Sequence, residues 1–163
     1  MKPITISALK NFPIQFEEFF YSIPENLWHW SPESWEGIPS ESFNAIEQIC
    51  HVRDIEVEGY HVRFKRLLTE ENPILESLDG YALVRTKMYA HAEPKLVFKE
   101  IQVAREKTLQ FLYNLTDIQL TRAGHFEGYG RVTVAGLIHY LCSHDQQHLS
   151  GLQWLSGKIE SNA

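Results

Sequence analysis

The chain has 163 residues, of which 44% are hydrophobic and 22% charged, and this excludes a disordered chain and predicts one globular domain over residues 1–163. A formal net charge of −6 argues against nucleic acid or an anionic membrane as a partner. No apolar run approaches the ~18 residues of a membrane span, and the N-terminal segment MKPITISALKNFP lacks a signal-peptide core, so we expect a cytoplasmic protein.

Apolar residues recur at helical spacing along nearly the whole chain, and no segment alternates as a strand does. The first helix is predicted over residues 9–21, with Pro13 tolerated only near its start. A connection rich in Pro, Trp and Ser follows over residues 24–40. The second helix is predicted over residues 41–68 and is ended by the Asn-Pro pair at 72–73.

The third helix is predicted to begin at Pro94, because proline is favoured at the first helical position. A Gly-rich loop is predicted over residues 116–132. The last helix is predicted to be capped by Thr133 and to stop at Gly157. Four amphipathic helices predict an all-α four-helix bundle, with at least about 55% helix and essentially no sheet.

The longest connection, residues 71–93, joins the second and third helices. Fully extended, about 23 residues reach roughly 75 Å. The second helix, with about 28 residues, is only ~42 Å long. A long crossover therefore fits between the second and third helices, and these two helices can run parallel.

The sharpest chemical signal is the segment HDQQH, in which His144 and His148 stand four residues apart. At ~100° per residue both fall within the apolar stripe of the last helix, so both imidazoles point into the core. An unsatisfied buried polar group costs roughly 1–3 kcal/mol, and one divalent cation would satisfy both imidazoles. Hydrogen-bonded core histidines are the structural alternative. Asp145 stands where a zinc protease has Glu, so the sequence excludes that class.

A third ligand has to come from another helix, and the second helix offers two histidines. His51 flanks the apolar face together with Glu47 and Asp54, whereas His61 lies closer to that face. Periodicity alone does not choose between them. The remaining candidates are predicted on the solvent face of the last helix or in loops: His139, His91 and His125.

Two segments resemble the DinB-like superfamily of damage-inducible-type, metal-binding four-helix bundles: IEQICHVRDIEVEGYHVRFKRLL at 46–68 and GYGRVTVAGLIHYLCSHDQQHLSGLQWL at 128–155. The resemblance covers most of the chain. It implies one metal ligand on the second helix, in a segment like QICHVRD, and two on the fourth, in a segment like HDQQH. In this sequence the implied ligands are His51, His144 and His148.

Three imidazoles with an open fourth position are typical of a catalytic zinc site rather than a closed structural one. Imidazole also suits nickel, iron and copper; zinc and nickel are the leading candidates, and iron comes next. An open position can activate water, hold a thiolate or polarise a carbonyl. Because imidazole has to be neutral to bind a metal, release is expected below about pH 6.

The resemblance implies a thiol-dependent transferase or a hydrolase that acts on a small-molecule substrate, with a low-molecular-weight thiol as a further cofactor. The alternative is a non-catalytic metal-binding bundle with a structural or stress-related interaction role. An open metal position beneath a pocket would favour the enzyme. A fourth protein ligand that closes the site would favour the structural role.

Several neighbouring residues are candidates for supporting roles. Asp54 and Glu47 could orient the His51 imidazole or could be ordinary surface charges. Tyr60 and Arg53 could line a substrate pocket. Cys50 and Cys142 are expected to be free thiols, with Cys50 an inert core residue. The first and third helices carry more apolar residues than one core can bury, so we expect a homodimer.

Overall fold

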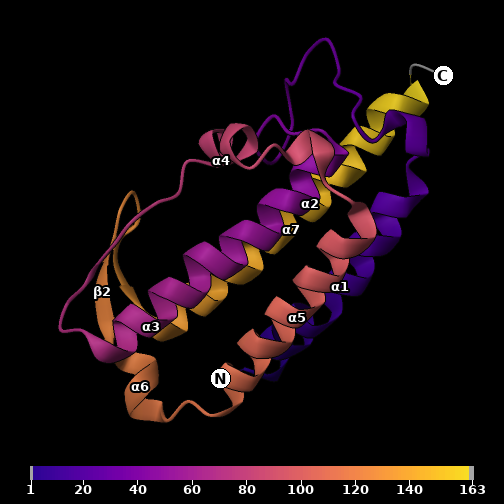
Figure 1. Cartoon of the computed structure of the whole chain (residues 1–163). Helices are drawn as coiled ribbons and strands as arrows, with labels where there is room; N and C mark the ends of the chain where they lie inside the picture. Colours follow the sequence, from indigo (N-terminus) through magenta and orange to yellow (C-terminus); the bar gives the residue numbers. More distant parts are fainter. Residues whose placement is uncertain (1, 162–163) are drawn as a thin grey trace.

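The computed structural model describes residues 2–161, and helices make up 69% of it. Four long helical segments lie side by side as a bundle (Figure 1). This confirms the all-α four-helix bundle. The segments are α1 (Pro3–Ser22), the continuous run α2 (Ala45–Asp54), η2 (Ile55–Tyr60) and α3 (His61–Thr69), then α5 (Pro94–Tyr113) and α7 (Val134–Ser161).

The directions of the four segments follow from the long crossover. α1 and α7 run one way along the bundle, whereas α2–α3 and α5 run the other way (Figure 1). α2 packs against α5 and α7, and α1 packs against the same two helices. The parallel pair formed by the second and third long segments agrees with the sequence prediction. The crossover carries three short elements: β1 (Ile74–Leu75), α4 (Gly80–Thr86) and η3 (Tyr89–His91).

The first helix begins earlier than predicted and holds a proline in its interior. It starts with Pro3 in its first turn, and Pro13 lies well inside it. Because proline has no N–H, the carbonyl of Leu9 loses its helical hydrogen-bond donor. Nη1 of Arg105, on α5, donates to that carbonyl at 2.8 Å. The interior proline is thus tolerated because a buried guanidinium takes over the freed acceptor.

The second helical segment begins at Ala45 rather than at residue 41, because Asn44 caps it. The Asn44 side chain accepts from the Glu47 N–H at 3.0 Å, and the Glu47 carboxylate accepts from the Asn44 N–H at 2.9 Å. This reciprocal pair is a capping box. Further along, η2 is a π-helical turn, a feature that is frequent at functional sites. Its wider turn shifts the helical phase of every residue that follows.

The predicted Gly-rich loop contains a short helix, α6 (Asp117–Thr121), and a β-hairpin, so the prediction of essentially no sheet is wrong here. β2 (Ala123–Phe126) pairs antiparallel with β3 (Gly130–Thr133) and parallel with β1. Gly128 makes the turn with a φ of +80°. A Cβ at Gly124 would lie 2.5 Å from the Pro73 carbonyl oxygen, so the close approach of β1 requires glycine.

The last helix starts as predicted and ends later. Thr133 Oγ1 accepts from the Gly136 N–H at 3.0 Å, which confirms the cap. The helix then continues through Gly157 to Ser161, so Gly157 is not its stop. Within residues 2–161, none of the helices combines the length and the apolar character needed to cross a membrane.

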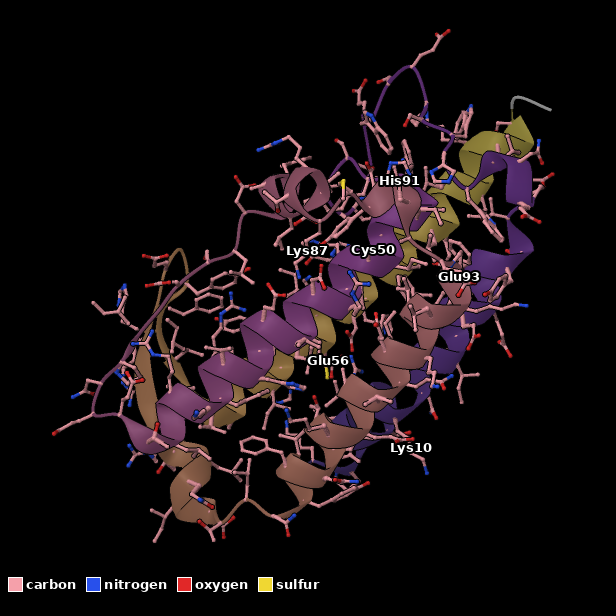
Figure 2. The ribbon with its side chains drawn as sticks, viewed as in Figure 1. Lys10, Cys50, Glu56, Lys87, His91 and Glu93 are labelled. Atoms are coloured by element: carbon pink, nitrogen blue, oxygen red, sulfur yellow. The ribbon has the colours of Figure 1, made fainter. Side chains whose placement is uncertain are left out.

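A buried charged layer divides the apolar core in two. Arg105, from α5, donates from Nε and Nη2 to Glu56 at 2.9 Å and from Nη1 to Asp145 at 2.8 Å. Thr108 donates to Glu56 at 2.6 Å. Glu56 belongs to η2 and its carboxylate reaches Arg105 on α5 (Figure 2). Two separate clusters of apolar residues make up the rest of the core.

Candidate metal centre

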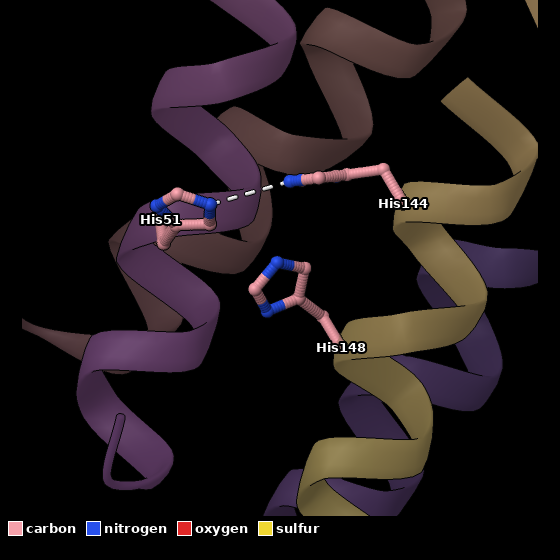
Figure 3. Close-up of side chains that lie close together, drawn as sticks. All are labelled: His51, His144 and His148. Atoms are coloured by element: carbon pink, nitrogen blue, oxygen red, sulfur yellow. Dashed lines mark hydrogen bonds between the residues drawn. The ribbon is translucent and has the colours of Figure 1, made fainter. Parts of the chain in front are cut away.

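The structure brings His51, His144 and His148 together at mid-bundle. His51 projects from α2 toward the two histidines of α7 (Figure 3). The Nε2 atoms of His51 and His144 are 3.3 Å apart, and one nitrogen from each residue lies within 4.8 Å of the others. His51 and His148 are buried, and His144 is partly exposed. Helical periodicity did not distinguish His51 from His61 as the candidate third ligand. The structure places His51, and not His61, beside His144 and His148.

The donor set fits a divalent cation. Nε2 of His148 is buried without a hydrogen-bond partner among the described residues. Four donors at 2.0–2.1 Å from one ion stand ~3.3–3.4 Å from each other in a tetrahedron. The separation of 3.3 Å between His51 and His144 matches that edge. That these three residues bind a metal stays a prediction, and the spacing and the unpartnered nitrogen support it.

Gln48 sets the tautomer of His148. Its side-chain Nε2 donates to Ser40 Oγ at 2.9 Å and to the Phe43 carbonyl at 3.2 Å, which turns Oε1 toward α7. Nδ1 of His148 lies 2.5 Å from that Oε1 and acts as the donor. The lone pair of His148 is therefore on Nε2, the atom that faces the other histidines. Gln48 was not among the residues predicted from the sequence, although its i, i+3 spacing to His51 places both on one helix face.

All three imidazoles are held neutral. Burial lowers the pKa of His51 to about 4. Burial and the neighbouring imidazoles lower the pKa of His144 and His148 well below the usual range, and nearby Arg63 and Arg105 add to this at His144. Neutral imidazole is the form that can bind a metal, so these pKa shifts favour the protonation state that the predicted site requires.

The carboxylates expected to support His51 have other partners. Asp54 accepts from Arg53 at 2.8 Å and from the Tyr89 hydroxyl at 2.6 Å, and it pairs with Lys87 at 3.2 Å. Lys87 lies beside α2, as Figure 2 shows, and also pairs with Glu58. Glu47 is used by the capping box. Asp54 is therefore a buried ion-pair partner of Arg53 and Lys87 rather than a surface charge, and neither carboxylate orients the imidazole.

The remaining histidines lie outside the cluster. Nε2 of His61 is 2.9 Å from Thr108 Oγ1, on the side of the helix that faces α5. His139 is exposed on α7, as the sequence predicts. His91 lies in η3 and His125 in β2, so each belongs to a short element rather than to a loop.

Two aromatic rings lie beside the cluster, and a groove between α2 and α5 lies apart from it. The Phe43 ring is 5.1 Å from the His51 ring, and the Tyr60 ring is 6.0 Å from the His144 ring. A groove of about 610 Å³ runs between α2 and α5 and is lined by Arg53. None of the three clustered histidines lines this groove.

Neither cysteine is activated. Burial raises the pKa of Cys50 to about 12 and that of Cys142 to about 11. Both are free thiols, as the sequence predicts. Because the thiolate is the nucleophile, two fully protonated thiols do not provide one.

A methyl group at Gly80 should disturb the site. A Cβ there would lie 2.8 Å from His51 Cε1 and 3.2 Å from Phe43 Cζ, so the imidazole has to move. We expect Gly80→Ala to lower the free energy of unfolding by roughly 1–3 kcal/mol and to weaken zinc binding.

The matched control is Gly157→Ala, where nothing lies within 4 Å of the added carbon. It should raise the free energy of unfolding by up to about 1 kcal/mol. Urea unfolding and chelator competition measure the two effects, and wild-type values for Gly80→Ala would contradict the prediction.

The stability of the metal-free protein should depend on His51 in acid. The pKa of His51 is about 4 when folded and ~6.5 when unfolded, so the unfolded chain binds more protons between these values. Stability is therefore lost as the pH falls from 6.5 toward 4. His51→Gln cannot be protonated. Between pH 7 and pH 5 the free energy of unfolding of the wild type should fall by about 2 kcal/mol more than that of this variant, as measured by urea unfolding with a chelator present. If the difference in free energy of unfolding between the wild type and His51→Gln did not change with pH, the prediction would be wrong.

The same pKa moves the expected metal release to lower pH. The sequence alone predicts release below about pH 6, the range in which an exposed imidazole takes up a proton. In the folded protein the His51 imidazole stays neutral down to about pH 4. Direct protonation of the site should therefore release the metal only as the pH falls toward 4.

Comparison with known proteins agrees with this architecture. A sequence model described as the DinB superfamily matches residues 9–151. Among solved structures, the chain is similar to YfiT from Bacillus subtilis, described as a probable metal-dependent hydrolase with an unusual four-helix bundle topology. The TM-score is 0.84 at 20% sequence identity, over 98% of this chain and 90% of that one, which shows a shared fold. A search of curated proteins gave no match.

Proposed function

The chain belongs to the DinB superfamily, and from this membership and the histidine cluster we propose that it is a divalent-metal-dependent enzyme acting on a small molecule. The observation that carries the proposal is the convergence of three neutral imidazole nitrogens at one point in the bundle. The proposed reaction is hydrolysis or transfer to a low-molecular-weight thiol. The description of YfiT as a probable metal-dependent hydrolase supports the first of these.

Each residue of the cluster has a defined part in this proposal. His51, His144 and His148 would hold the ion, with zinc and nickel as the leading candidates and iron next. A divalent ion in this position supplies a Lewis acid. Gln48 keeps the Nε2 lone pair of His148 directed at the ion. The rings of Phe43 and Tyr60 shield the histidines from bulk water, which strengthens electrostatic interactions within the site.

The test combines metal analysis with an activity screen. The purified protein is expected to hold one equivalent of a divalent metal after dialysis. The metal-loaded protein is then assayed with ester and amide substrates, and for transfer to small thiols. His148→Ala is assayed in parallel, because any activity that survives this substitution does not come from the cluster. Metal binding with no turnover in any of these assays would favour the non-catalytic alternative, and no metal binding would refute both.

We also propose that the protein is a cytoplasmic homodimer. α1 and α5 each expose large apolar side chains, among them Ile4 on α1 at 74% and Val103 on α5 at 59% exposed. A second copy of the chain would cover them. The two free cysteines suit a reducing compartment. Light scattering at micromolar concentration is expected to give twice the chain mass, and a monomer mass would refute the dimer.

A further inference from the structure

A fourth side chain reaches the histidine cluster from outside the helices. The Glu41 carboxylate lies in the loop before α2, with Oε2 3.5 Å from His148 Nε2 and Oε1 3.8 Å from His51 Nε2. Its two oxygens therefore straddle the two buried histidines. No motif or helical spacing in the sequence marks this residue, because the loop has no periodicity that relates it to α2 or α7.

The separations from His148 and His51 approach those of a fourth ligand, and the Glu41 carboxylate would have to shift to join the three histidines, whose donor atoms all lie within 4.8 Å of one another. Donor atoms that share a tetrahedral ion at 2.0–2.1 Å stand ~3.3–3.4 Å apart. The separation between Glu41 and His148 is within a few tenths of an ångström of that edge, and the separation between His51 and His144 matches it. Carboxylate oxygen is an ordinary ligand for zinc and related divalent ions. A buried unpartnered nitrogen, His148 Nε2, faces the same point.

The loop that carries Glu41 is fastened on both sides of it. On one side, Ser40 Oγ accepts from the Gln48 amide at 2.9 Å. On the other side, the Ser42 N–H donates to the Tyr81 hydroxyl at 3.2 Å. Gln48 also holds His148, so one amide fixes both a ligand and the loop. Gly151 of α7 makes this approach feasible, because a Cβ there would lie 2.6 Å from Ser40 Oγ.

From this geometry we propose that Glu41 is the fourth protein ligand of the metal and that an anionic ligand from solution displaces it. The displacement follows from exposure. The side chain of Glu41 is 40% exposed on a loop, whereas the side chains of His51 and His148 are 3% and 0% exposed on helices. Glu41 is the ligand that can turn to solvent without disturbing the bundle. A small thiolate is the anion that the proposed function suggests.

The inference rests on metal binding by the cluster, so the test measures binding rather than turnover. Wild type, Glu41→Gln and Glu36→Gln are loaded with Co²⁺, whose visible spectrum reports its coordination number. Glu36 is an exposed carboxylate in the same connection and serves as the matched control. Zinc dissociation constants are measured by chelator competition. Circular dichroism checks that each variant is folded.

We expect Glu41→Gln to raise the zinc dissociation constant by about tenfold or more and to change the Co²⁺ spectrum, because an amide is a weaker ligand than a carboxylate. Glu36→Gln should behave as the wild type. 2-Mercaptoethanol, followed by its sulfur-to-cobalt charge-transfer band, should saturate Glu41→Gln at a lower concentration than the wild type, since it no longer competes with a carboxylate.

Three results would overturn the inference, and they can be told apart. If no variant binds metal, the proposed function fails together with it. If the wild type and Glu41→Gln bind zinc equally and give the same Co²⁺ spectrum, only the role of Glu41 fails. If Glu41→Gln binds metal more weakly but the thiol never enters the wild-type site, Glu41 is a permanent ligand, and the displaceable role is refuted.

Discussion

His148→Ala should abolish stoichiometric metal binding and leave the helix content unchanged. Structural zinc sites bind their ion with a free energy of about 10–16 kcal/mol. Each of three or four ligands therefore accounts for roughly 3 kcal/mol or more of this binding free energy. This corresponds to a loss of affinity of at least about a hundredfold. Helix content should persist, because His148 lies in the middle of the 28-residue helix α7 and its backbone hydrogen bonds do not depend on the side chain. Metal analysis after dialysis and circular dichroism measure the two quantities.

The matched control for this variant is His139→Ala. His139 lies on the same helix, is exposed and belongs to no cluster. It should retain one equivalent of metal under the same dialysis. If the His148→Ala protein also retained a full equivalent, the metal would have to bind elsewhere, and the assignment of the cluster would be wrong.

Replacing Arg105 with Met should destabilise the fold more than any other single substitution considered above. The guanidinium is 2% exposed and holds Glu56, Asp145 and the carbonyl of Leu9. Removing it takes away the donors of the Asp145 carboxylate and of the Leu9 carbonyl, and it leaves the buried Glu56 carboxylate with Thr108 alone. Breaking a buried ion pair from one side costs roughly 3–5 kcal/mol, so we expect a loss of that size in the free energy of unfolding, measured with urea.

A surface arginine provides the comparison. Arg66 pairs with Glu70 one helical turn away, and the Glu70 side chain is 43% exposed. Arg66→Met should lower the free energy of unfolding far less than Arg105→Met does, because exposed ion pairs contribute little. Burial raises the pKa of Asp145 to about 7 even beside Arg105, so without Arg105 the free energy of unfolding should fall further as the pH rises and Asp145 ionises. Equal losses for the two variants would show that the buried layer contributes no more than a surface pair.

Local sequence was sufficient to predict the four long helices and the two candidate metal ligands on the last helix. His144 and His148 share a helix face by their spacing alone, and the apolar stripe shows which way that face points. The cap at Thr133 and the helix start at Pro94 depend only on neighbouring residues, and both were predicted correctly. The long crossover followed from a comparison of two lengths. The ligand on the second helix came from the family resemblance, because helical periodicity did not separate His51 from His61.

Tertiary structure decided the features that depend on residues far apart in the chain. The π-helical turn η2 shifts the helical phase between His51 and His61, so only the packed bundle shows which histidine meets α7. Pro13 lies within α1 because Arg105, 92 positions along the chain, supplies the missing donor. Glu41 reaches the cluster because Gln48 fastens its loop. In each case the energy comes from a contact between distant segments, and periodicity within one helix carries no information about such a contact.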